Sequence, residues 1–256
     1  FFTAVAHEHR RCFWLDGGGA RDWSGRRSLI GWLDDDDVSL TYSAARREVL
    51  RHTGSTSQVV GDDIFAVLEA ELAGPGTAGG QWFGYLGYAC RPDLPARPDP
   101  DLPDAVWMRP GRGRVRLFEH EVPGDSPTFP GVATPQNVRN PRFTGDSATP
   151  PPAYAAAFAR VQDELHAGNT YEVNLTYRLT EQPARPARAT PASQDPASDP
   201  AQLYLRLRAL NPAPYAGFLQ HDVTTVPQAR AWLLSSSPER YATVTAERTL
   251  ETKPIK

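Results

Sequence analysis

The first third of the chain contains short apolar runs whose length and spacing predict β-strands. Three of these runs cover residues 10–16, 28–33 and 38–42. The four aspartates at 34–37 separate the last two runs and indicate a solvated turn.

Further strands are predicted where small residues interleave with aromatic ones and where polarity alternates. Residues 80–89 are typical of a buried strand, with close backbone approach at Gly84 and Gly87. Residues 104–108 and 113–120 predict a hairpin, because the second arm alternates between apolar and polar side chains.

Helical periodicity occurs at three places. The pattern predicts a helix over 62–73 that begins at an aspartate cap, a helix over 152–167, and a third that begins at Asp199-Pro200. Strict alternation from Tyr171 to Leu179 predicts a strand. The remaining predicted strands cover 215–220, 231–236 and 240–246. Many strands with interspersed helices and no regular βαβ alternation predict an α+β fold with a mostly antiparallel core.

Two segments rich in proline and small residues interrupt these elements, at 121–152 and 181–200. Their composition is typical of linkers or long surface loops. We therefore predict a first region over residues 1–130 and a second over 150–256.

Composition narrows the class of protein. The 256 residues carry a formal net charge of −3, and 22% are charged, which argues against a strongly basic nucleic-acid binder. No apolar run is long enough for a transmembrane helix and no secretory signal opens the sequence, so we expect a cytoplasmic protein with no membrane partner. The two cysteines fit neither a disulfide framework nor a zinc cluster.

The basic residues are unevenly distributed. Only two of the 27 are lysines, Lys253 and Lys256, and both fall among the last four residues. Arginine is always charged, whereas lysine can become a neutral nucleophile. Glu239 follows the predicted strand 231–236, so a carboxyl and an amine at neighbouring strand ends are a workable acid and nucleophile. Taken without further knowledge, the same residues favour a surface salt bridge.

Five segments, taken in order, resemble motifs of the chorismate-utilising enzymes, the family that includes anthranilate synthase component I. They are GQWFGYLGY at 80–88, GNTYEVNLT at 168–176, NPAPYAGFL at 211–219, LSSSPERY at 234–241 and TKPIK at 252–256. The resemblance implies antiparallel sheets packed as a sandwich with flanking helices, incomplete at the C-terminus. It also implies that Mg²⁺, which holds the substrate in this family, has its ligands downstream of residue 256, and that the 256 residues alone are inactive.

The lysine at position 256 indicates one branch of that family. Anthranilate synthases usually have alanine at the matching position, whereas lysine marks the aminodeoxychorismate synthases, which supply 4-aminobenzoate for folate. The resemblance implies that Lys256 attacks chorismate, that Glu239 protonates the departing hydroxyl, and that a glutamine amidotransferase supplies ammonia. An ammonium cannot attack, so the lysine pKa must fall from ~10.4 to ~7.4, at a cost of about 4 kcal/mol. Two alternatives stay open, anthranilate synthase component I and a non-catalytic tryptophan-binding or subunit-docking module.

The family resemblance also implies a site for L-tryptophan. The matching positions are Gly17, Ser24, Gly25, Arg26, Arg27, Pro214, Tyr215 and Ala216. Relatives often have serine where Gly17 stands, and losing that hydroxyl removes a ligand contact worth ~1–2 kcal/mol. The alternative is that these residues only pack two sheets together.

Overall fold

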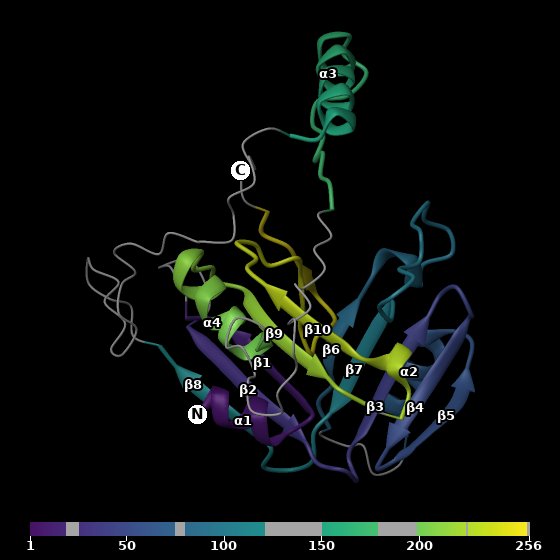
Figure 1. Ribbon diagram of the computed structural model, residues 1–256, viewed down its shortest axis with the longest axis vertical. Coiled ribbons are helices and arrows are strands. Elements are labelled where there is room, and N and C mark those ends of the chain that lie inside the picture. The colour runs from purple at the N-terminus through teal and green to yellow at the C-terminus, as the bar shows by residue number, and fades with distance from the viewer. Residues whose placement is uncertain (19–25, 75–79, 121–149, 179–198, 224, 255–256) are drawn as a thin grey trace, which may run out of the picture. The chain divides into compact units, whose positions relative to one another are not determined.

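The computed structural model describes residues 1–18, 26–74, 80–120, 150–178, 199–223 and 225–254. They belong to two compact units (Figure 1). The first unit comprises Phe1–Phe129 and Gln194–Lys256, and the second comprises Pro130–Ser193.

The first unit contains two five-stranded sheets in which every described strand pair is antiparallel. Sheet A has the strand order β10-β9-β1-β2-β8. Its strands are β1 (Arg11–Asp16), β2 (Arg27–Leu33), β8 (Val115–Glu119), β9 (Ala216–His221) and β10 (Ala231–Ser235). Strands β9 and β10 therefore join strands that lie some 200 residues earlier in the chain, and this places the later motifs beside the first strand.

Sheet B has the strand order β5-β4-β3-β7-β6. Its strands are β3 (Val38–Ser43), β4 (Glu48–Thr53), β5 (Thr56–Gly61), β6 (Phe83–Leu86) and β7 (Ala105–Arg109). Helix α2 (Ile64–Ala73) packs on this sheet, and the Asp63 side chain caps it as the sequence predicts. The remaining elements are the 3-10 turns η1 (Tyr88–Cys90) and η2 (Pro227–Ala229) and a hairpin of β11 (Thr243–Val244) and β12 (Leu250–Glu251).

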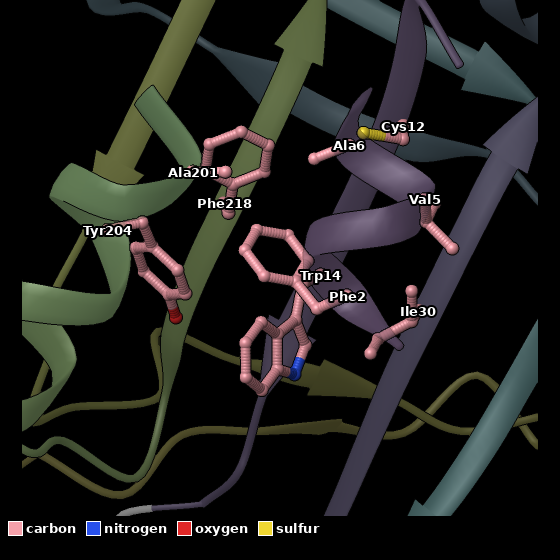
Figure 2. Close-up of a cluster of buried hydrophobic side chains, with 9 residues drawn as sticks. All are labelled: Phe2, Val5, Ala6, Cys12, Trp14, Ile30, Ala201, Tyr204 and Phe218. Carbon is pink, nitrogen blue, oxygen red and sulfur yellow. The ribbon is translucent and has the colours of Figure 1, made fainter. Parts of the chain in front are cut away.

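Helices α1 (Phe2–Glu8) and α4 (Pro200–Leu210) pack on sheet A through an aromatic core. Figure 2 shows the rings of Phe2, Trp14, Tyr204 and Phe218 gathered there. The helix α4 begins at its Asp199 cap with proline in the first turn, as predicted. Because four rings from four elements interlock, the position of α4 on sheet A is well defined.

A second core joins the opposite face of sheet A to sheet B. Phe13 stacks on Phe83 with 4.1 Å between ring centroids, and Met108 and Leu219 are buried beside them. Gly31 is required next to Phe13, because a Cβ there would overlap the ring. The two sheets therefore meet through tightly packed apolar side chains.

The second unit is described over residues 150–178 and contains helix α3 (Pro152–His166), as predicted. Gly168, with φ of +74°, follows the end of the helix. The predicted strand at 171–179 is wrong for the described residues up to 178, which form no ladder. The Tyr177 ring instead lies 4.9 Å from that of Tyr154 on α3. Alternation alone does not create a strand without a neighbour to pair with.

The predicted hairpin at 104–120 is also wrong. Strand β7 pairs with β3 and β6 in sheet B, whereas β8 pairs with β2 in sheet A. The predicted strand at 80–89 is reduced to β6, at the edge of sheet B. Close approach at its two glycines is confirmed, since a Cβ at Gly84 would overlap the Val106 carbonyl and one at Gly87 would lie 3.0 Å from that of Asp104. The fold as a whole is α+β with antiparallel sheets, as predicted.

Candidate functional site

Two of the sequence motifs meet where strands β9 and β10 come together. The Ser236 hydroxyl donates to the Asn211 carbonyl at 2.6 Å, and the Tyr215 amide donates to the Ser237 carbonyl at 3.2 Å. The segments 211–219 and 234–241 are therefore neighbours in space, as adjacent antiparallel strands require.

Glu239, the predicted general acid, lies just beyond this junction. The Ser237 hydroxyl accepts from the Glu239 amide at 3.4 Å and donates to the Glu239 carbonyl at 3.0 Å, which fixes the backbone of a tight Ser-Pro corner. The Glu239 side chain is exposed. A general acid needs desolvation to keep its proton near neutral pH.

Residues 237–254, called here the hairpin arm, connect Glu239 to the lysine-containing end. Arg240 Nη2 donates to Glu251 Oε2 at 2.8 Å, and Lys253 Nζ lies 3.0 Å from Glu251 Oε1. The Thr252 hydroxyl donates to the Tyr241 carbonyl at 2.8 Å. The structure therefore brings the motif that contains Glu239 beside the motif that contains Lys253. Lys256 lies outside the described residues.

The positions that match a tryptophan site come together only in part. Ala216 pairs with Asp16, next to Gly17, and the Gly17 amide donates to the Ser28 hydroxyl at 3.0 Å. A Cβ at Gly17 would overlap the Arg27 carbonyl, so a serine does not fit there without a backbone shift. Ser24 and Gly25 lie outside the described residues. Arg26, Pro214 and Tyr215 belong to the segments that flank these strands.

An open apolar row beside Gly17 escaped the sequence analysis. Leu15 pairs with Leu29 and Gly217, and Leu29 pairs with Leu117, so the four residues share one face of sheet A. This is also the face of Phe13, two residues away. Leu15 is 45% exposed and Leu117 54% exposed, although both lie on the face of sheet A that carries Phe13 and packs on sheet B. Side chains alternate between the two faces of a strand, so Leu15 shares the face of Phe13, but only the pairing shows that the row is continuous.

Buried polar contacts attach helix α4 to strand β1. The guanidinium of Arg208 donates to the Asp16 carboxylate at 2.5 Å, and the Tyr204 hydroxyl donates to it at 3.1 Å. Arg208 also lies over the Trp14 ring, 5.1 Å from its centroid. Burial, followed by the charge of Asp16, raises the pKa of Tyr204, which stays a hydrogen-bond donor. These contacts fix the end of α4, from which the motif at 211–219 begins.

One described cavity, of about 780 Å³, lies at the opposite end of β1. Its walls include Arg11, Arg114 and the aspartates at 34–36, and none of the motif residues lines it. The predicted solvated turn is in fact partly buried, because Asp37 is buried and bonds to Arg114 at 2.9 Å. Burial raises the pKa of Asp37 even so. The cavity therefore belongs to a structural ion-pair cluster and not to the candidate site.

The described residues do not fit a Mg²⁺ site. Within the described ranges, no three histidine, cysteine or acidic side chains lie close enough together to bind a metal ion. Glu251 faces two cations and Asp37 faces Arg114, so these carboxylates are already neutralised. Over the same part of the chain, no helix is both long and apolar enough to cross a membrane.

Several curated proteins are similar to this chain in sequence. An aminodeoxychorismate synthase from Streptomyces pristinaespiralis is 28% identical over 295 residues, which span all of this chain and 38% of that protein. Aminodeoxychorismate synthase component 1 from Klebsiella aerogenes is 31% identical over 183 residues, covering 64% of this chain and 34% of the relative. Anthranilate synthase component 1 from Thermus thermophilus is 31% identical over 137 residues, covering 52% of this chain and 26% of that protein.

The matches thus cover between 26% and 38% of the length of these three curated relatives. The model of one family, described as chorismate binding enzyme, matches residues 10–256. That match includes the junction of the two motifs, the hairpin arm and both sheets. The chain belongs to the chorismate binding enzyme family.

Proposed function

We propose that this chain is part of an aminodeoxychorismate synthase, which converts chorismate and ammonia to 4-amino-4-deoxychorismate and water. The observation that carries the proposal is the contact between Arg240 and Glu251 in the hairpin arm, which joins the motif containing Glu239 to the residues that lead to Lys253. Lysine at position 256 supports amination at ring carbon 4, because a neutral amine is a nucleophile and alanine is not.

The proposed reaction balances in two steps. Glu239 gives its proton to the 4-hydroxyl, which leaves as water while the Lys256 amine forms a bond to ring carbon 2. Ammonia then forms the bond at carbon 4 and expels the lysine, and the spare proton returns to Glu239. A glutaminase partner or fused domain is the proposed source of ammonia. The described residues supply no Mg²⁺ site, so no step here is assigned to a metal ion.

We further propose an anthranilate synthase-like sandwich for the first unit. The stacking of Phe13 on Phe83 and the burial of Met108 beside them support this arrangement of the two sheets. The exposed apolar row around Leu15 supports an apolar ligand such as L-tryptophan at the open end of that interface. The free thiols of Cys12 and Cys90 support a reducing compartment, the cytoplasm.

The test of the proposed activity uses the natural polypeptide that contains these residues, supplied with chorismate, ammonium and Mg²⁺. We expect 4-amino-4-deoxychorismate as the product, detected by chromatography and mass spectrometry. Lys256→Ala should abolish that product and Lys253→Arg should retain it. Anthranilate as the product would favour the rival function that the Thermus thermophilus relative suggests. Absence of both products from a folded, chorismate-binding protein would favour the non-catalytic module.

A further inference from the structure

The hairpin arm is poorly stabilised by its own backbone ladder. Strands β11 and β12 have two residues each and pair through Thr243↔Glu251 and Val244↔Leu250. Val244 and Leu250 are both 66% exposed, so the hairpin buries little apolar surface. An isolated two-stranded hairpin is marginal in water. Other contacts must therefore keep the two strands of the hairpin together.

Those contacts gather at the open end of the hairpin, on the side of Glu239. Each oxygen of the Glu251 carboxylate meets one cation, Arg240 at 2.8 Å and Lys253 at 3.0 Å. The Thr252 hydroxyl adds a bond to the Tyr241 carbonyl at 2.8 Å. Continuing the β11–β12 register places Tyr241 opposite Lys253, in agreement with that bond. Glu251 thus joins the immediate neighbour of Glu239 to the first of the two lysines.

The ion pairs of Glu251 with Arg240 and Lys253 persist at neutral pH. Hydrogen bonds from Lys253 and then Arg240 lower the pKa of Glu251, so its carboxylate stays ionised. A carboxylate whose pKa is lowered in the folded state stabilises that state fully above its ordinary pKa. It loses this stabilisation as the pH falls through its pKa in the folded state. The side chains of Arg240, Glu251 and Lys253 are 30%, 45% and 67% exposed. Exposed pairs add little to global stability, so the effect of this junction is local.

We propose that Arg240 and Glu251 are positioning residues that hold the Glu239 segment beside the segment that contains Lys253. This inference rests on the proposed function, because it assigns the two segments to one reaction site. Neither residue is proposed to touch the reacting atoms. Their effect is on the distance between a carboxyl and an amine, which a cross-link can measure without any turnover.

The composition of the chain makes that measurement specific. Its only side-chain amines are those of Lys253 and Lys256, and both lie in the tryptic peptide 249–256. The tryptic peptide 231–240 contains one acidic side chain, Glu239. A zero-length carbodiimide cross-link between these two peptides therefore joins Glu239 to one of the two lysines. Mass spectrometry of the digest gives its yield.

We expect the cross-link in the wild-type chain and a loss of about five-fold in Glu251→Gln, the ratio that an exposed ion pair can supply. Glu251→Asp, which keeps the charge, should restore most of the yield. The matched control is Asp222→Asn, which removes the exposed partner of Arg230 in the same unit and leaves both peptides unchanged.

Each outcome decides the proposal. Loss in Glu251→Gln with retention in Glu251→Asp and Asp222→Asn supports it. An unchanged yield in Glu251→Gln, an equal loss in Asp222→Asn, or no cross-link in the wild type would overturn it. Failure of the proposed function shows up elsewhere, as product formation that persists in Lys256→Ala while the cross-links behave as expected.

Discussion

Two regions of the first unit position the candidate site in opposite ways. Where helix α4 meets strand β1, the Asp16 side chain is 1% exposed and that of its partner Arg208 is 16% exposed. In the hairpin arm, the Arg240 and Glu251 side chains are 30% and 45% exposed. The first region fixes a motif by desolvated charge and interlocked rings, and the second by contacts that water competes for. Stability and local geometry should therefore respond to different substitutions.

The largest expected effect is at the buried pair. Arg208→Ala leaves the Asp16 carboxylate buried without its cation, which should lower the free energy of unfolding by about 3–5 kcal/mol. Urea denaturation measures this loss. The matched control is Arg230→Ala, which breaks the exposed pair with Asp222 and should cost less than about 1 kcal/mol. Equal losses in the two variants would remove the distinction between the regions.

Acid should weaken the buried polar contacts between the sheets. Burial lowers the pKa of His52 to about 4 and that of His221 to about 3, and their rings lie 5.3 Å apart. Both histidines are neutral in the folded protein. Their contribution to the free energy of unfolding is therefore complete above their ordinary pKa near 6.5, and it is lost as the pH falls toward their pKa values in the folded state.

Because of His52 alone, the free energy of unfolding should be about 3 kcal/mol lower at pH 4 than at pH 7. Urea denaturation at both pH values measures it, and His52→Gln should reduce the difference. A pH dependence in His52→Gln as steep as in the wild type would show that other groups cause the acid loss.

A smaller effect is expected when only one donor to Asp16 is removed. Tyr204→Phe keeps the aromatic packing around Trp14 and Phe218 and deletes a hydrogen bond to a carboxylate, at a cost of about 1.5 kcal/mol. The same denaturation assay measures it. A loss as large as that in Arg208→Ala would mean that the Tyr204 hydroxyl anchors α4 as strongly as the ion pair does.

The smallest effect on stability is expected in the hairpin arm. Glu251→Gln should leave the urea midpoint of the first unit unchanged, because the Glu251 side chain is 45% exposed and belongs to none of the three described apolar clusters. A shift of the urea midpoint would show that the hairpin arm unfolds together with the apolar cores, and the two regions would then not differ in their effect on stability.

Local sequence patterns predicted the elements but not their partners. The cap at Asp63, the proline start of α4 and the glycine at the end of α3 each act within one turn, so the sequence reveals them. Strands β7 and β8 show the limit, because alternation specifies a face and says nothing of which strand lies alongside. The predicted strand after Gly168 failed for the same reason.

The candidate site was predictable only as separate motifs. The role predicted for Glu239 comes from the resemblance of its segment to known motifs, and the structure shows which residues lie next to it. Asp16 and Arg208 stand 192 positions apart, so no local signal indicated the buried pair that anchors α4. The exposed leucines around Leu15 became a continuous row only when the pairing with β2 and β9 was known.

The most direct test of the account is the fate of chorismate on the natural polypeptide that contains these residues. Incubation with chorismate, ammonium and Mg²⁺ should yield 4-amino-4-deoxychorismate, and Lys256→Ala should yield none while still unfolding at the wild-type urea midpoint. Undiminished amination by Lys256→Ala would contradict the account.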